Sequence, residues 1–276
     1  MSDPLLPAVP PDRRPPDLPP ALRAARARTP ARILVGRAGP SYPTATQLGL
    51  RQDHAAALDA VHAELDLGRD LGRDFVGRWQ LFEVQTQAAG KVEYLMRPDL
   101  GRRLSSGGRS RVERDCPAGA DVQVIIGDGL SVAAVAAQVP KLLPLLADEV
   151  RAKGWTFGRP FVVRHCRVGV LNEVGELLDP AVAVLLLGER PGLATAESLS
   201  AYLAYRPRPG HTDAQRNLIS NIHARGVSAG EAARRIVALA EKMRLMQASG
   251  VAVKEELPAA SGVDRVEHDH GERAEE

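Results

Sequence analysis

The alternation of short, buried-type apolar runs with helical patterns after residue 120 is the feature that most constrains this fold. A run of β-branched and aliphatic residues bounded by turn signals predicts a strand that is buried on both faces. Three such strands are predicted, at Asp121–Asp128, Pro160–His165 and Ala181–Leu187. Strands that alternate with helices form a largely parallel sheet. The sequence therefore predicts an α/β fold with a Rossmann-like, largely parallel sheet domain.

Helical patterns fill the intervals between these strands. Ser131 is placed to cap a helix that ends at Gly154, and Pro140 is expected to kink or restart it. A short strand or turn at Arg167–Val170 leads into a helix near Glu173–Leu178. These elements complete the strand–helix alternation.

Two further helical regions flank this domain. Thr44–Gln87 is rich in Ala, Leu and charged residues with apolar positions near helical spacing, and Ser228–Ala248 has a clear apolar stripe. Eleven of the 21 prolines lie in Met1–Pro43, which leaves little regular period there, although Ala21–Arg28 could form a short basic helix. We therefore predict four segments: a flexible Pro/Arg-rich tail (1–30), a helical N-terminal segment (31–110), the α/β domain (111–256) and a disordered charged tail (257–276).

Composition excludes several functional classes. The 36 Lys and Arg nearly balance the 34 Asp and Glu, so charge predicts no nucleic-acid partner. Two cysteines are too few for a disulfide framework or a four-thiolate metal site, which favours a reducing, intracellular setting. The longest apolar runs are far shorter than the roughly 20 residues that span a bilayer, so no membrane association is predicted.

Candidate binding residues are those that directly follow the predicted strands, because ligands of open parallel sheets bind beyond the carboxyl ends of the strands. Gly127–Ser131 could hold an anion at a helix start, or be a plain turn with a cap. Gly188–Leu193 places Glu189 either to accept hydrogen bonds in a ligand-facing loop or to form a local ion pair with Arg190. Arg216–His223 is a third candidate, or a capped loop before the last helix.

Other combinations do not support catalysis or metal binding by this chain. His54 and His62 lie about 12 Å apart along a helix with no third ligand in register. His165 and Cys166 are adjacent at a strand end and would point to opposite faces, so we interpret them as structural. The third glycine of a dinucleotide-binding fingerprint is missing after Gly127 and Gly129, which argues against NAD. We therefore predict no catalytic residue and no metal ligand here.

An ordered set of short motifs runs along the chain. The motifs are Val35–Pro40 (VGRAGP), Pro98–Arg103 (PDLGRR), Ile126–Ser131 (IGDGLS), Arg167–Val170 (RVGV), Gly188–Leu193 (GERPGL) and Ile219–His223 (ISNIH). Together, and in this order, they resemble one family, the small (light) subunit of ethanolamine ammonia-lyase. The resemblance runs from about Ala31 to Glu256.

The resemblance implies part of an adenosylcobalamin-dependent lyase that converts ethanolamine to acetaldehyde and ammonia by radical chemistry. The substrate site would lie on a large partner subunit, several large–small pairs would form a hetero-oligomer, and this chain would clamp the cofactor. The implied cofactor-binding positions are Val168, Glu189 and Leu218, where Leu218 replaces a family Cys. Base-on binding is implied, with no protein histidine on cobalt, and the D-x-H-x-x-G pattern that supplies one elsewhere does not occur here.

Two alternatives remain open from the sequence. The chain could be a free-standing α/β protein that binds a nucleotide-like ligand or acts as a scaffold without catalysis. A cytoplasmic location is expected. A bacterial microcompartment is the alternative, because the resemblance implies that the N-terminal end of some family members directs packaging there.

Overall fold

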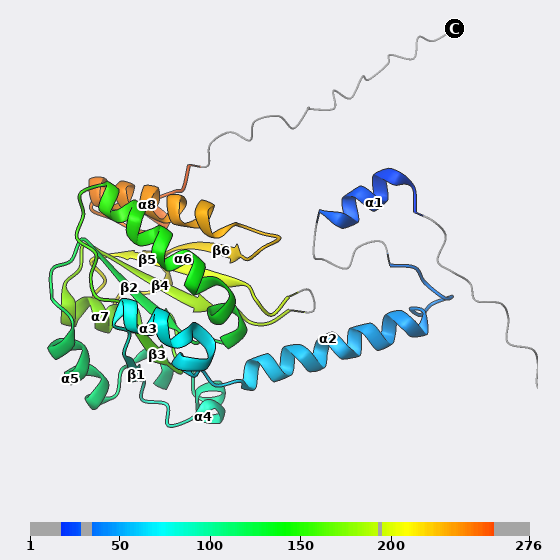
Figure 1. Cartoon of the computed structure of the whole chain (residues 1–276), viewed down its shortest axis with the longest axis horizontal. Helices are drawn as coiled ribbons and strands as arrows, with labels where there is room; N and C mark the ends of the chain where they lie inside the picture. The colour runs from blue at the N-terminus through cyan, green and yellow to red at the C-terminus, as the bar shows by residue number, and fades with distance from the viewer. Residues whose placement is uncertain (1–17, 29–34, 193–194, 257–276) are drawn as a thin grey trace, which may run out of the picture.

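The computed structural model describes residues 18–28, 35–192 and 195–256. The predicted tails 1–30 and 257–276 lie outside the described residues, apart from 18–28. Within that part is the short helix α1 (Pro20–Ala27), close to the predicted position. The longer helix α2 (Thr44–His62) extends away from the sheet (Figure 1) and, like α1, contains no buried residue.

A six-stranded sheet forms the centre of the fold in the order β1-β3-β2-β4-β5-β6. The pairings among the first four strands are parallel, whereas β5 pairs antiparallel with both β4 and β6. The strands are β1 (Glu83–Gln85), β2 (Val122–Gly127), β3 (Phe161–Arg164), β4 (Val182–Gly188), β5 (Leu199–Tyr205) and β6 (Asn217–Ile222). The α/β class is confirmed, and because the sheet is mixed the Rossmann-like label stays a prediction.

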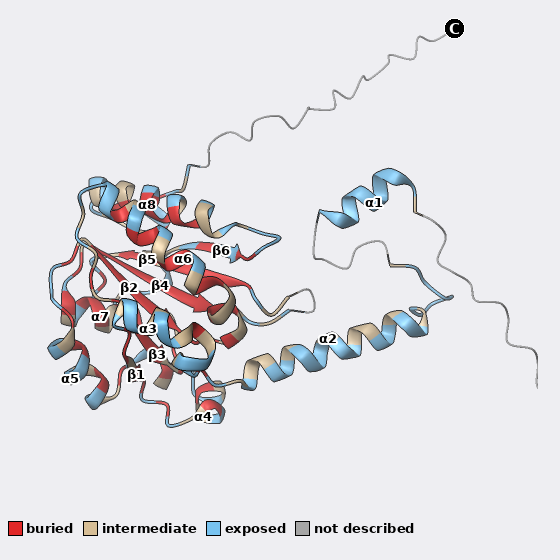
Figure 2. Ribbon diagram, in the orientation of Figure 1, coloured by how far each residue is buried: buried red, intermediate tan, exposed pale blue. Residues whose placement is uncertain are grey.

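Helices cover the two faces of the sheet unequally. On one face, α6 and α8 pack over β2, β4, β5 and β6 with a π-helical turn and α3 beside them, and on the other face α5 and α7 pack over β1 to β4. Figure 2 shows the strands buried between these layers. The covering helices are α3 (Arg73–Trp79), α5 (Ser106–Asp115), α6 (Val132–Ala152), α7 (Val170–Leu178) and α8 (Ala229–Met246), and the π-helix is Leu67–Gly72.

The three predicted strands are confirmed as β2, β3 and β4, and the predicted helices as α6, α7 and α8. Of the two effects expected at Pro140, the restart is wrong, because one helix continues through Pro140 and Pro144, and the kink stays a prediction. Buried residues before and after the prolines, such as Val135 and Leu146, pack in one core. Burial of that stripe outweighs the backbone bonds that the prolines remove.

Three strands were not predicted. β1 lies inside the segment predicted to be helical, so the sheet takes its edge strand from before residue 111. β6 occupies the segment interpreted as a loop, and β5 was not identified. Short elements link the layers: α4 (Lys91–Met96) and the 3₁₀ turns Leu100–Arg102, Asp213–Gln215 and Gly250–Ala252. In the part of the chain described here, no helix is long and apolar enough to cross a membrane.

Candidate functional site

The carboxyl edge of the parallel strands brings together the predicted loops after β2 and β4 and the segment after β3, whereas the third candidate segment, Arg216–His223, spans β6 and reaches this edge only at its end. β2, β3 and β4 are mutually parallel, so the segments that follow Gly127, Arg164 and Gly188 leave the sheet at the same edge. β5 begins and β6 ends there as well, because Leu199 pairs with both Gly188 and Ile222. Ligands of open α/β sheets bind at this edge.

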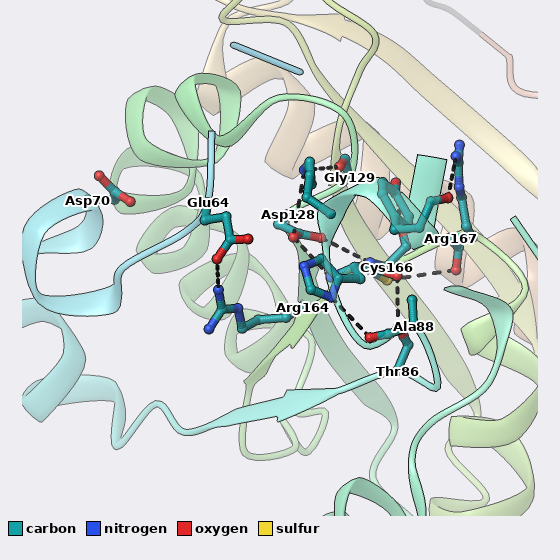
Figure 3. A network of polar contacts seen from close by, with 12 residues as sticks. Glu64, Asp70, Thr86, Ala88, Asp128, Gly129, Arg164, Cys166 and Arg167 are labelled. Carbon is teal, nitrogen blue, oxygen red and sulfur yellow. Dashed lines mark hydrogen bonds and ion pairs between the residues drawn. The ribbon is translucent and has the colours of Figure 1, made fainter. Parts of the chain in front are cut away.

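A buried carboxylate, Asp128, organises this edge (Figure 3). Its Oδ2 accepts a hydrogen bond from the backbone N–H of His165, and its Oδ1 accepts one from that of Cys166, both at 2.9 Å. The Nζ atom of Lys91 lies 4.0 Å from Oδ2 and donates to the carbonyl of Gly129 at 3.1 Å. The loop after β2 is thus tied to the loop after β3 by charge-assisted bonds.

Two side chains, one directly after β1 and one from α4, complete this buried network. The Thr86 hydroxyl donates to the carbonyl of His165, and the Tyr94 hydroxyl donates to that of Cys166, each at 3.0 Å. His165 adopts a left-handed backbone conformation with φ of 55°, a conformation that costs free energy for a residue other than glycine. The network therefore holds a strained turn that leads directly into Arg167.

The titration of these groups agrees with a structural role. Burial raises the pKa of the Cys166 thiol well above its usual value, which is the opposite of what a nucleophile requires. Burial lowers the pKa of Lys91, although the Asp128 carboxylate opposes this shift. The loop Gly127–Ser131 also has its own partners: the Ser131 hydroxyl caps α6 by accepting from the N–H of Ala134, so the plain-turn interpretation is favoured.

Beside this network lies a groove of about 750 Å³, lined by Val168 among others. Two motifs that are 64 residues or more apart build its walls. The backbone N–H of Arg167 donates to the carbonyl of Gly101 at 2.8 Å, and a Cβ atom on Gly101 would lie 2.7 Å from the Arg167 side chain. In turn, a Cβ atom on Gly169 would lie 2.8 Å from the stem of Arg102. The glycines are required because the backbones approach so closely.

Arginines dominate the lining of this groove. The five guanidinium groups face three carboxylates, and two of the arginines hold all three: Arg109 pairs with Glu173 and with Glu176, and Arg216 pairs with Asp213. The remaining lining arginines are Arg102, Arg103 and Arg167.

The face of β5 and β6 next to the groove is only partly covered. Leu218 pairs with Tyr202 across the two strands, so both side chains lie on this face, and Leu218 is 47% exposed. Tyr202 lines the groove and is half-buried, and burial together with the nearby carboxylates of Glu189 and Asp213 raises its pKa. Among the described residues, α7 reaches β4 on this face while the other face of β5 and β6 packs under α8.

Glu189 lies at the end of β4, where its carboxylate joins β5 to β6. Its Oε1 accepts from the hydroxyl of Ser200 at 2.7 Å and from the backbone N–H of Asn221 at 2.9 Å. The structure shows no ion pair between Glu189 and Arg190, both of which it describes. Glu189 therefore accepts hydrogen bonds from the chain itself, and its contact with a ligand stays a prediction.

The structure brings the predicted residues to one side of the sheet: Val168 lines the groove, Leu218 neighbours the groove residue Tyr202, and Glu189 lies near that tyrosine. Sequence reasoning did not identify Lys91, Arg103 or Arg109, and it included Asp128, Arg102, Arg167 and Arg216 only as members of motifs or candidate segments. The adjacent arginines Arg102 and Arg103 were a sequence signal of local positive charge. No pattern in the sequence indicated that they would lie near Arg216.

Comparison with known proteins gives a consistent result. The profile of the family described as ethanolamine ammonia-lyase light chain (EutC) matches residues 20–254. A protein of Clostridium perfringens named ethanolamine ammonia-lyase small subunit is 42% identical over 229 residues, covering 83% of this chain and 76% of that protein. One of the same name from Bradyrhizobium diazoefficiens is 42% identical over 262 residues, covering 93% and 94%.

Proposed function

The chain belongs to the ethanolamine ammonia-lyase light-chain family, and from this premise we propose that it holds adenosylcobalamin against a large catalytic subunit that converts ethanolamine to acetaldehyde and ammonia. As a small subunit it is part of a lyase complex. The substrate site is assigned to the large subunit.

The partly uncovered face of β5 and β6 beside the arginine groove is the observation that carries this proposal. A corrin ring is broad and largely apolar on its faces, carries amide groups on its rim, and bears a nucleotide tail with a phosphodiester. Leu218 and Tyr202 offer apolar surface, and Val168 continues it into the groove. The residues present therefore fit the chemistry of this cofactor.

Each side chain has a distinct task under this proposal. Leu218 and Val168 contact the cofactor by apolar packing and exclude water, a contact that does not need the thiol of the family Cys. Glu189 is held by Ser200 and Asn221 through Oε1, so its other oxygen is oriented to accept from an amide N–H. When bound, the cofactor supplies radical chemistry through its cobalt–carbon bond, and the chain supplies position and closure.

The first test is co-purification with the large subunit, followed by adenosylcobalamin-dependent release of ammonia from ethanolamine with each chain omitted in turn. Activity should require both chains and the cofactor. Activity of the large subunit and cofactor without this chain would refute the proposed role. The absence of any complex would remove the basis for assigning cobalamin as the ligand of this chain.

Two variants localise the cofactor face. Leu218→Glu places a charge on the apolar face and should weaken cobalamin binding to the complex at least tenfold, because an unpaired carboxylate would be desolvated there. The matched control is Leu245→Glu, on the opposite side of the sheet on α8, where the side chain is 81% exposed. Glu189→Ala should raise the apparent cofactor KM more than it lowers turnover at saturation. Equal effects of the two leucine variants would contradict the assignment.

Location and assembly complete the proposal. We assign the complex to the cytoplasm as a hetero-oligomer of several large–small pairs, with packaging in a bacterial microcompartment as the alternative. α1 is basic in its last turn and has no buried residue. Cell fractionation of the full chain and of a variant without residues 1–28 distinguishes the two locations, and mass photometry of the complex gives the number of pairs.

A further inference from the structure

The arginine groove carries more positive charge than its own carboxylates neutralise. Arg109 and Arg216 hold the three lining carboxylates, which leaves Arg102, Arg103 and Arg167 with no carboxylate partner among the described residues. Arg167 instead packs its guanidinium 4.2 Å from the centre of the Tyr94 ring and donates to the Tyr94 carbonyl. The groove is therefore built to face an anion.

Three residues that line the same groove carry side-chain nitrogens without a partner. In the described part of the chain, Nε of Arg167, Nε of Arg216 and Nδ1 of His211 are buried with no hydrogen-bond partner. The side chain of Arg216 is only 7% exposed, and its other nitrogens bond to Asp213 and, at 3.1 Å, to the side-chain oxygen of Asn172. The two arginine Nε atoms are donors without an acceptor in the chain, whereas Nδ1 of His211 donates or accepts according to its tautomer. All three atoms are covered by protein atoms, so they mark side chains that the chain does not fully satisfy and do not themselves contact the groove.

The charges of the groove also oppose one another. Burial lowers the pKa of Arg216, and the charge of Arg102 lowers it further, while Asp213 partly compensates. An anion bound between Arg102 and Arg216 would offset this repulsion.

We infer that this groove is an anion site for a phosphate group, held by Arg102, Arg216 and Arg167. A phosphate has several acceptor oxygens and matches the fork of the guanidinium group. The groove volume of about 750 Å³ leaves room for substituents on that phosphate. If the proposed function holds, on which this assignment of the source rests, the group is the phosphodiester of the cofactor's nucleotide tail; a free phosphate offers the same chemistry.

The test measures binding to the complex with the large subunit. Equilibrium dialysis with absorbance detection gives the affinities for cyanocobalamin and for dicyanocobinamide, which lacks the nucleotide and its phosphodiester. Line broadening in phosphorus NMR spectra gives the affinity for inorganic phosphate. The variants are Arg102→Gln, Arg102→Lys and Arg216→Gln, and the matched control is Arg234→Gln, an exposed arginine on α8 on the opposite side of the sheet.

Arg102→Gln and Arg216→Gln should each weaken cyanocobalamin binding about tenfold and leave cobinamide binding unchanged, because one charge-assisted hydrogen bond is lost. Arg102→Lys should restore part of the affinity, and Arg234→Gln should have no effect. Arg102 is exposed, so its variants test the site even where Arg216→Gln does not fold.

Other outcomes distinguish a phosphodiester of the cofactor from a free phosphate, or contradict the anion site. Loss of phosphate binding with unchanged cyanocobalamin binding supports the anion site and assigns it to a free phosphate. If the wild-type complex binds no cobalamin, the proposed function fails. The affinity for inorganic phosphate then decides by itself whether the groove binds an anion. Unchanged affinity for both ligands, or equal loss of cyanocobalamin and cobinamide, overturns the inference.

Discussion

Replacing Asp128 by alanine should destabilise the protein strongly and disturb the proposed cofactor site with it. The substitution removes the acceptors of two buried backbone amides and the counter-charge of a buried ammonium group, that of Lys91. Each buried amide without an acceptor costs about 1–3 kcal/mol. Deleting one partner of a buried ion pair costs about 3–5 kcal/mol.

These contributions do not add fully, because Lys91 keeps its bond to the carbonyl of Gly129 and can release its proton. We expect Asp128→Ala to lower the free energy of unfolding by about 5 kcal/mol. Asp128→Asn should cost about half as much, since its amide keeps one acceptor oxygen. Urea denaturation of both variants at pH 7 gives the two values.

The pH dependence identifies the ion pair as the cause. Burial already lowers the pKa of Lys91, and loss of the Asp128 charge lowers it further. A depressed folded-state pKa means that the unfolded chain binds more protons, so the stability of the variant rises with pH relative to the wild type. The cost of Asp128→Ala should thus be smaller at pH 9 than at pH 7, and Lys91→Met should reduce it in a double-mutant cycle. A cost below about 1 kcal/mol at pH 7 would refute this reasoning.

Three further predictions follow from single contacts. Gly169→Ala should cost about 1–3 kcal/mol in urea denaturation, since the new Cβ atom would lie 2.8 Å from the Cβ and Cγ atoms of Arg102 and the backbone must move, and it should weaken cobalamin binding several-fold in dialysis; unchanged cobalamin binding would contradict the groove assignment. Ser131→Ala should lower the unfolding free energy by about 1–2 kcal/mol, more than the exposed cap variant Ser228→Ala, and equal costs would contradict a buried cap. Burial raises the pKa of Cys116 to about 11 from 9.0. The neutral thiol therefore contributes fully to the free energy of unfolding below pH 9, and about 2–3 kcal/mol of that free energy is lost as the pH rises to 11. Cys116→Ala should flatten that part of a stability–pH curve, and an unchanged slope would exclude this thiol.

The elements predicted correctly are those with a strong local pattern. β2 and β4 are buried on both faces and have continuous aliphatic runs, and α8 shows its apolar stripe at helical spacing. The missed strands lack such patterns. β1 has three residues at an edge, and β6 exposes Leu218 and Ser220 on one face, so its sequence does not distinguish a strand from a loop.

Sequence also identified part of the candidate site. Selecting Glu189 depended only on the rule that ligands bind beyond carboxyl ends. The implied positions Val168 and Leu218 came from resemblance, and the place of Leu218 beside Tyr202 became visible only through the antiparallel pairing of β5 with β6. The sequence pattern placed Asp128 in a turn, and no neighbouring residue indicated that its carboxylate would accept hydrogen bonds from the loop after β3.

By itself, therefore, the sequence determined the α/β class, the central strands and the loops at their ends, because these depend on the side chains of neighbouring residues. Only the tertiary structure decided that Gly101 and Gly169 interlock two distant motifs, and that Arg102 and Arg216 face one groove. The physical reason is that close backbone approach and uncompensated charge are properties of segments brought together by folding. No periodicity along the chain records which distant segments will meet.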